Sequence, residues 1–231
     1  MGKRFGARWV LRDLSFALAP GALLGLVGAN GGGKTTTLRM LAGLLRPDEG
    51  TGRVFGYDIA RPSNALRRQV GYMSQRLSLY PELSVAENLS FRARVLKLPR
   101  ARSAIAESID RLGLAPVTNI RFDRLSGGWA RKVQFAAATI HRPKLLLLDE
   151  PTAGLDAASR HIFWRWLTEF ASEGHIVIVS THDLAEAERC PAILHYVAGK
   201  AEGPMSPSTL IGTAGCTTLE EAVLSMTADP G

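Results

Sequence analysis

Short runs of apolar residues alternate along the chain with longer stretches in which apolar side chains recur every three or four positions. Continuous apolar runs are typical of strands buried on both faces of a parallel sheet, whereas the longer period is typical of amphipathic helices. The helical period is clear over 34–45 and 157–170. This alternation predicts an α/β fold with a mostly parallel central sheet. The expected strands cover residues 23–27, 70–74, 145–148, 176–179 and 192–197.

The strand signal disappears over about 83–125, which predicts an inserted α-helical subdomain. Ser84 and Glu87 have the spacing of a capping box, in which each residue's side chain accepts a hydrogen bond from the other's backbone amide. The helix that they begin is expected to extend to about residue 98. A second helix fits 101–112, where apolar residues lie on one face.

The whole chain, 1–231, is expected to form one domain. Beyond residue 199 the composition is rich in Gly, Pro, Ser and Thr, which predicts a short C-terminal tail over about 200–231. One short helix is expected within that tail, near 219–226. The aromatic residues at intervals of four within 157–170 are expected to pack in the core.

Composition and charge narrow the class of protein. With 46% apolar residues the chain can bury a core, but no apolar run approaches the length of a membrane span. Cys190 and Cys216 are too few for a disulfide framework and suit a reducing cytosol. The formal charge of +7 comes from scattered basic residues. A solvated surface is therefore favoured over a patch for nucleic acid or anionic lipid, although charge alone does not decide.

Residues 28–35 fit the phosphate-binding loop pattern, in which Gly, four residues and Gly-Lys-Thr lie between a strand and a helix. Glycines let backbone amides approach phosphate oxygens, and the following helix directs its positive end at them. Lys34 supplies a point charge to the β and γ phosphates, and Thr35 supplies a hydroxyl to Mg²⁺. The pattern predicts binding of ATP and Mg²⁺. The candidate residues of this loop are Gly28, Asn30, Gly31, Gly33, Lys34, Thr35 and Thr36.

Polar residues follow three other predicted strands. Asp149 and Glu150 come after 145–148, and we expect Asp149 to hold Mg²⁺ and Glu150 to orient the attacking water. His182 comes just beyond 176–179, and Gln75 directly after 70–74. Taken alone each of these residues has an ordinary structural interpretation. In a parallel sheet, however, the strands end at one edge, so all four side chains are expected to face the phosphate loop.

Residues 125–128, Leu-Ser-Gly-Gly, precede a further predicted helix. Ser126 and Gly128 offer a hydroxyl, free amides and a helix N-terminus, which together form an anion site. The nucleotide that this chain itself binds is already expected at the phosphate loop. A second nucleotide, held by another subunit, is therefore the expected occupant of this site.

With these motifs in order, the chain resembles the ATP-binding subunits of ABC transporters over nearly its whole length. The phosphate loop, Gln75, the signature at 125–128, the acidic pair, a D-loop at 154–156 and His182 carry the resemblance. The segments 71–75, 126–129 and 185–190 resemble the branch that exports drugs and lipids, and 218–222 is a weaker match to it.

The resemblance implies a P-loop NTPase fold, a small N-terminal antiparallel β part and ATP hydrolysis. Two such subunits, here most simply a homodimer, meet head to tail around two ATP molecules, so that Ser126 and Gly128 grip the γ-phosphate bound by the partner. Glu150 is then the catalytic carboxylate, Gln75 lies near Mg²⁺ and water, and His182 contacts the γ-phosphate. Phe5 stacks on adenine. A separate transmembrane permease docks at the helical insert, which places the chain peripherally on the cytoplasmic face of the cell membrane.

The chain departs from the family pattern in three places. Trp129 replaces the commonest Gln after the signature glycines, and the phosphate loop has Ala29 and Gly32 where Pro and Ala are usual. The sequence also begins almost at Phe5, so the edge strand that normally precedes this aromatic is not expected. Either the start of the sequence is misplaced, or the peripheral antiparallel sheet is short and holds Phe5 poorly.

Two other functions stay open at this point. The first is a soluble ABC ATPase acting on nucleic acid or ribosomes. The fifty residues of 76–125 leave no room for the long coiled coils of DNA-repair relatives, so no nucleic-acid partner is expected. The second is one half of a tandem or heterodimeric ATPase. Export rather than import rests on the resemblance alone, and the sequence does not identify the cargo.

Overall fold

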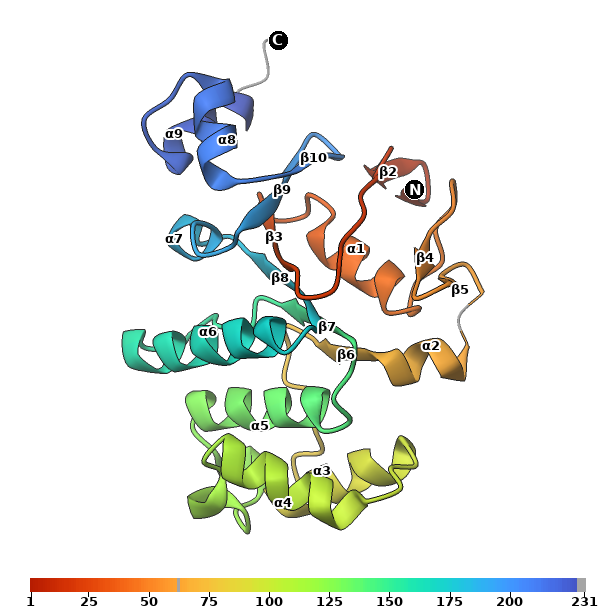
Figure 1. Cartoon of the computed structure of the whole chain (residues 1–231), viewed down its shortest axis with the longest axis vertical. Helices are drawn as coiled ribbons and strands as arrows, with labels where there is room; N and C mark the ends of the chain where they lie inside the picture. The colour runs from red at the N-terminus through yellow and green to blue at the C-terminus, as the bar shows by residue number, and fades with distance from the viewer. Residues whose placement is uncertain (62, 228–231) are drawn as a thin grey trace.

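The computed structural model describes residues 1–61 and 63–227. Its centre is a six-stranded sheet in the order β10-β9-β3-β8-β7-β6 (Figure 1). Every neighbouring pair is parallel except β10 and β9, which are antiparallel. The mostly parallel sheet is confirmed, and the five predicted strands are present. The strands are β3 (Leu23–Gly28), β6 (Val70–Met73), β7 (Leu145–Asp149), β8 (Ile176–Thr181), β9 (Ala192–Val197) and β10 (Lys200–Met205).

Both faces of the sheet are covered, because successive residues of a strand point to opposite sides. In β7, Leu146 and Leu148 join one hydrophobic cluster, while Leu145 and Leu147 join another. The second cluster lies under the helices α1 (Lys34–Leu41) and α2 (Asn64–Gln69). The first lies under α5 (Gly127–Thr139), α6 (Ala157–Ser172) and α7 (Leu184–Ala187).

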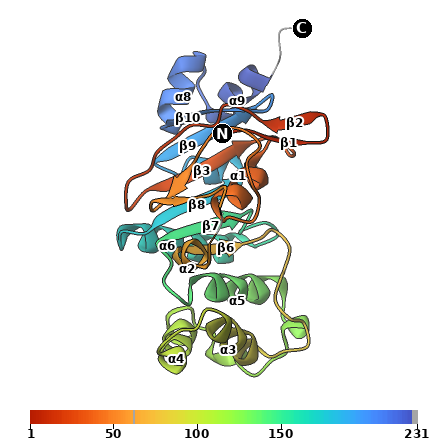
Figure 2. The same cartoon turned by 90° about the vertical axis from the view of Figure 1, so that its right-hand side faces the viewer.

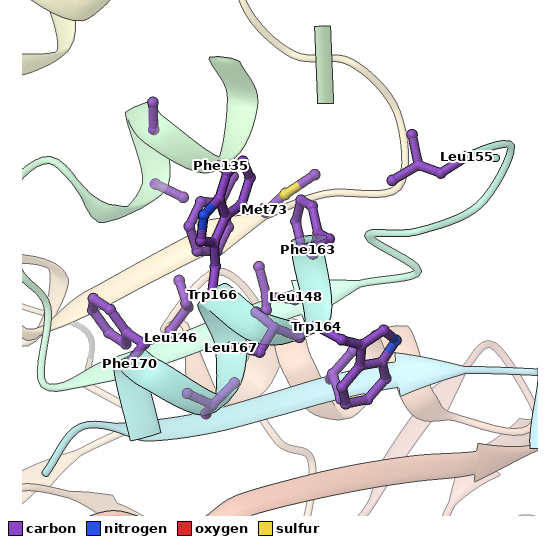
Figure 3. Packing of buried hydrophobic residues seen from close by; sticks show 14 of the residues in the cluster. Met73, Phe135, Leu146, Leu148, Leu155, Phe163, Trp164, Trp166, Leu167 and Phe170 are labelled. Atoms are coloured by element: carbon purple, nitrogen blue, oxygen red, sulfur yellow. The ribbon is translucent and has the colours of Figure 1, made fainter. Parts of the chain in front are cut away.

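The aromatic residues of α6 pack in the core, as predicted. Phe163, Trp166 and Phe170 are each less than a tenth exposed. Phe135 of α5 stacks on Trp166 with ring centroids 5.5 Å apart and meets Phe163 edge to face (Figure 3). These contacts fix α5 against α6, so the helix that begins at the signature is anchored to the core of the sheet.

The helical insert is present and packs beside α5, at the end of the molecule opposite to the C-terminal helices (Figure 2). It contains α3 (Val85–Val95), α4 (Ala101–Arg111) and two short 3₁₀ turns, η1 (Ala115–Val117) and η2 (Phe122–Arg124). The predicted capping box of Ser84 and Glu87 is formed. The first helix ends at Val95, earlier than predicted, because Lys97 adopts a left-handed backbone (φ +52°). The amides of Lys97 and Leu98 then bond back to the carbonyls of Arg94 and Ala93, which closes the helix.

Small antiparallel elements flank the sheet. One pairs β1 (Lys3–Phe5) with β2 (Arg8–Leu11) through a turn at Gly6, and the other pairs β4 (Arg53–Val54) with β5 (Tyr57–Asp58). The peripheral antiparallel part is short, as expected. Phe5 is the last residue of its three-residue strand and is 53% exposed.

The segment after residue 199 contains more structure than its composition predicted. The expected short helix is α9 (Leu219–Thr227), but β10 and α8 (Pro207–Ala214) were not predicted. Every second residue of β10 is exposed at the edge of the sheet, which leaves no apolar run to detect. Leu210 and Leu219 are fully buried in the first cluster. Nowhere in the described residues is a helix both long and apolar enough for a membrane span.

Candidate functional site

The carboxyl ends of β3, β6, β7 and β8 meet at one edge of the sheet, because these strands run parallel. A cavity of about 580 Å³ opens near this edge, and it brings the phosphate loop together with Gln75, Glu150 and Phe5. Its lining is formed by Phe5, Arg8, Val10, Asn30, Gly31, Gly33, Lys34, Thr35, Thr36, Gln75 and Glu150.

The loop between β3 and α1 adopts backbone angles that require glycine. Gly28, Gly31 and Gly33 have φ values of +140°, +79° and +109°. A Cβ on Gly28 would also lie 2.4 Å from the backbone oxygen of Tyr196, far inside contact distance. Any larger residue at this position would have to displace β9. The loop therefore keeps its curved backbone, with amides free to converge on an anion.

Lys34 begins α1 and folds back over the loop. Its Nζ donates to the carbonyl oxygens of Gly28 (2.5 Å) and Ala29 (3.0 Å), and the residue is only 5% exposed. Burial lowers the pKa of Lys34, while the negative charges of Glu150 and Asp149 oppose that shift. No side chain caps the N-terminus of α1, so a buried cation and open helical amides lie at the same point.

Asp149, at the end of β7, is held by two hydroxyl groups. Thr35 Oγ1 donates to its Oδ1 at 2.9 Å, and Ser180 Oγ donates to the same oxygen at 2.7 Å. The hydroxyl and carboxylate oxygens of Thr35 and Asp149 fit Mg²⁺, which proteins hold with one or two such groups beside substrate phosphates. No cluster of three or more His, Cys, Asp or Glu forms an alternative metal cage within the part of the chain that the structure describes.

Glu150 follows β7, and side chains that follow the two neighbouring strands, β6 and β8, lie against its carboxylate. Gln75 Nε2 donates to its Oε2 at 2.9 Å, and His182 Nδ1 lies 3.2 Å from its Oε1. Its side chain is 11% exposed, whereas that of His182 is 58% exposed. Glu150 also has a φ of +46°, a left-handed conformation that is strained for a residue with a side chain. The predicted grouping of Gln75, Glu150 and His182 is therefore present, with the carboxylate held between the other two side chains.

Sequence reasoning missed some residues of this site. Ser180 was predicted to follow the strand 176–179 and was given no role, but it lies within β8, and its hydroxyl reaches Asp149 because β8 pairs with β7. Arg8 faces Phe5 across the β1–β2 hairpin, and both line the cavity. The turn at Gly6 between two short segments of β-type residues was the signal that could have placed Arg8 beside Phe5.

The structure does not bring Ser126 and Gly128 into this cavity. Ser126 occupies the N-cap position of α5, but its exposed hydroxyl makes no capping hydrogen bond. The position of a Cβ on Gly128 lies nearest to Ser159 and Leu155, in the segment after the acidic pair. The start of α5 is thus an uncapped helix end outside the chain's own cavity.

A sequence profile described as "ABC transporter" matches residues 11–153, which is more than half of the chain. The chain belongs to the ABC transporter family. The match extends from β2 to just beyond the acidic pair, so it contains the phosphate loop, Gln75, the signature and Glu150.

Curated relatives of this ABC cassette agree with that assignment. "Nod factor export ATP-binding protein I" of Paraburkholderia xenovorans (strain LB400) is 37% identical over 94% of this chain and 73% of the relative. "Probable multidrug ABC transporter ATP-binding protein YbhF" of Escherichia coli (strain K12) is 39% identical over 87% of this chain. That match covers 35% of the relative, so this chain corresponds to about a third of its length.

Solved structures give the same fold. An ATP-binding subunit of an ABC transporter superposes with a TM-score of 0.88 and 28% identity, over 98% of this chain and 96% of the other. A dimeric ATP-binding cassette in a post-hydrolysis state with ADP and phosphate superposes with a TM-score of 0.80 and 24% identity, over 89% and 94%. The predicted family, the P-loop NTPase fold and the assignment as a transporter ATPase are confirmed, in preference to an ATPase acting on nucleic acid or ribosomes.

Proposed function

We propose that this cassette is the ATP-hydrolysing subunit of an exporter. The observation that carries the proposal is one cavity that unites the phosphate loop with the Glu150 carboxylate, which accepts a hydrogen bond from Gln75 and lies beside His182. Export is favoured because the Nod factor relative is named for export and aligns with nearly all of this chain. The cargo is selected by a permease on a separate chain.

In this proposal the phosphate loop binds the triphosphate. The amides of residues 28–33 and the ammonium group of Lys34 hold the β and γ phosphates, and Thr36 lies beside them in the cavity lining. Thr35 and Asp149 hold Mg²⁺, with Gln75 nearby. Bound Mg²⁺ neutralises charge that develops on the phosphate oxygens during transfer. On binding, Lys34 would exchange its contacts with the loop carbonyls for the phosphates, and Thr35 would exchange its bond to Asp149 for Mg²⁺. The new contacts would compensate for the burial of the Lys34 charge.

Glu150 acts as the catalytic carboxylate. It accepts a proton from, or orients, the water that attacks the γ-phosphate. Gln75 donates to one of its oxygens and His182 lies 3.2 Å from the other, so the carboxylate has a defined direction before nucleotide arrives. The strained backbone of Glu150 is consistent with this role, because such conformations persist where function requires them. His182 is exposed enough to turn toward the γ-phosphate.

A second cassette completes the site. Ser126 and Gly128 lie outside their own cavity at an uncapped helix end, which suits contact with the γ-phosphate held by a partner subunit. Two copies of this chain, arranged head to tail, would place two ATP molecules between them. Phe5, half exposed on the rim of the cavity, stacks on the adenine.

The permease is expected to dock in a groove of about 590 Å³ between the sheet and the helical insert. Tyr80 and Phe91 line it, meet edge to face at 4.8 Å and are 49% and 39% exposed. None of the described residues that line the groove is acidic, whereas Arg67, Arg68, Arg92 and Lys97 are basic. An apolar permease segment with acidic residues would complement this groove. Docking there would hold the cassette on the cytoplasmic face of the cell membrane as a peripheral subunit.

The variant Glu150→Gln tests the proposed function. Light scattering with and without Mg²⁺-ATP measures dimer formation, and phosphate release measures turnover. We expect the wild type to turn over slowly and Glu150→Gln to lose about 100-fold or more in turnover while forming a stable ATP-bound dimer. Glu169→Gln, which changes an exposed carboxylate on α6, is the matched control and should behave as the wild type.

Two results would contradict this proposal at different points. A wild type that binds ATP but neither dimerises nor hydrolyses it would exclude the homodimer and point to a different partner cassette. A wild type that does not bind ATP would exclude the assigned nucleotide site.

A further inference from the structure

Gln134 is a buried polar residue in the middle of α5, and it contacts a segment far away in the sequence. The residue is only 3% exposed. Its Nε2 donates to the backbone oxygen of Ser74 at 3.1 Å and to that of Arg76 at 2.9 Å. An amide nitrogen carries two hydrogens, so these two bonds use its full donor capacity. The Oε1 of the same amide accepts a long hydrogen bond from Arg131 at 3.5 Å.

The two carbonyl groups that Gln134 holds lie on either side of Gln75. One side chain therefore fixes the main chain both before and after the residue whose own amide reaches Glu150 at 2.9 Å. The segment after β6 has left the sheet at this point, so these contacts replace the ladder hydrogen bonds that would otherwise hold it.

The same contacts join two parts of the molecule. Gln134 belongs to the helix that begins at Ser126, and the packing of Phe135 against Phe163 and Trp166 prevents that helix from moving freely (Figure 3). A displacement of α5 would therefore displace the backbone on both sides of Gln75. Loss of the amide would leave two carbonyl oxygens with fewer partners in a partly buried position, at a cost in free energy.

We propose that Gln134 is a positioning residue for ATP hydrolysis, which clamps the main chain on both sides of Gln75 to the signature helix and so sets the contact between Gln75 and Glu150. The proposal rests on the proposed function, in which Glu150 is the catalytic carboxylate. Gln134 does not line the nucleotide cavity and acts only through Gln75. Gln134 thereby connects two parts of the proposed mechanism. One is α5, whose start at Ser126 contacts the partner's nucleotide, and the other is Glu150, which acts on the nucleotide of its own chain.

Gln134→Met removes both donors while keeping the length and volume of the side chain. We expect kcat for ATP hydrolysis to fall about ten-fold, because a small misplacement of a catalytic group is costly, and KM for ATP to change less than two-fold. Gln134→Asn is the second variant, since it remains polar and can reach at most one of the two carbonyls. Gln134→Asn should fold, and its kcat should fall less than that of Gln134→Met. The matched control is Thr139→Val, which removes one local hydrogen bond from the same helix and should not change kcat.

A double-mutant cycle separates positioning from general destabilisation. If Gln134 acts through Gln75, Gln134→Met should lower kcat in the wild type but change it less than two-fold in a Gln75→Ala background. An equal loss in both backgrounds would overturn the proposal, as would an unchanged kcat in Gln134→Met, or a KM effect without a kcat effect.

Hydrogen–deuterium exchange of residues 74–78 in nucleotide-free protein provides a readout that needs no ATPase activity. Exchange should be about ten-fold faster in Gln134→Met and unchanged in Thr139→Val. Unchanged exchange in both Gln134 variants would overturn the clamp. Because this measurement requires no nucleotide, a wild type without ATPase activity would refute the proposed function and still leave the clamp to be decided by exchange.

Discussion

Replacement of Ser180 by alanine tests how the acidic end of β7 is held. The Ser180 hydroxyl is fully buried, donates to Asp149 Oδ1 at 2.7 Å and accepts from the backbone amide of Glu150 at 3.1 Å. Ser180→Ala removes both contacts and leaves the fold otherwise unchanged. Asp149 then keeps the hydrogen bond from Thr35 Oγ1 at 2.9 Å.

The size of the effect follows from these contacts. A hydrogen bond to a charged group contributes about 1.5–3 kcal/mol to stability. The Glu150 amide also lies 3.2 Å from the backbone oxygen of Ser180, so it keeps a partner, and little is added for that group. We therefore expect the free energy of unfolding to fall by about 2 kcal/mol, which corresponds to a Tm lower by about 4–8 °C for a chain of this size.

The assay is urea unfolding followed by circular dichroism, with thermal melting as a second measure. Ser172→Ala is the control, because its exposed hydroxyl bonds only to a carbonyl of its own helix, and it should change stability by less than about 0.5 kcal/mol. ATP hydrolysis by Ser180→Ala should need a higher Mg²⁺ concentration than hydrolysis by the wild type. When Thr35 turns to the metal, Ser180 is the hydroxyl that still holds Asp149, and the variant lacks it. An effect of Ser180→Ala no larger than that of the control would refute this account of Asp149.

Two further predictions concern packing and pH. In Gly71→Ala the new Cβ would lie 2.3 Å from the backbone oxygen of Ala138, so β6 and α5 must separate. Urea unfolding should show a loss of about 2–3 kcal/mol in the free energy of unfolding. The control Gly212→Ala, whose new Cβ has nothing within 4 Å, should instead gain stability because alanine favours the helix. Burial lowers the pKa of His141 to about 4, so between its ordinary pKa of 6.5 and 4 only the unfolded state gains a proton. Stability should therefore fall as pH falls through that window, by up to about 3 kcal/mol from this group. His141→Gln should remove that part of the pH dependence in unfolding measured at pH 7 and pH 5, whereas the exposed His161→Gln should retain it.

Much of the fold could be predicted from local patterns. The five parallel strands were recognisable because strands buried on both faces are continuously apolar, and the capping box of Ser84 and Glu87 is a local arrangement of two side chains. The strand β10 escaped prediction because an edge strand exposes every second residue and gains its partner only from β9. The predicted end of α3 was late because the left-handed residue that closes this helix is Lys97, whereas such a position is usually marked by glycine.

The candidate site divides in the same way. The phosphate loop was evident from sequence, since its glycines, Lys34 and Thr35 are neighbours and their geometry is local. The contact of Ser180 with Asp149 depends on the pairing of two strands, and the clamp of Gln134 on the chain around Gln75 depends on the packing of a helix against a loop. Residues of these types are common in strands and helices, so nothing in their immediate sequence marked them.

The amino-acid sequence by itself determined most of the strands and helices, where the phosphates can bind and which family the motifs resemble, because these depend on residue types at short spacings. The grouping of Gln75, Glu150 and His182 was predicted, but only the tertiary structure decided which atoms meet. Gln75, 75 residues away in the chain, donates to one oxygen of Glu150, and His182 lies 3.2 Å from the other. Strand order arises from burying both faces of the sheet at once, and that is a property of contacts between distant segments. The same contacts leave Ser126 and Gly128 outside the cavity, at the uncapped start of α5.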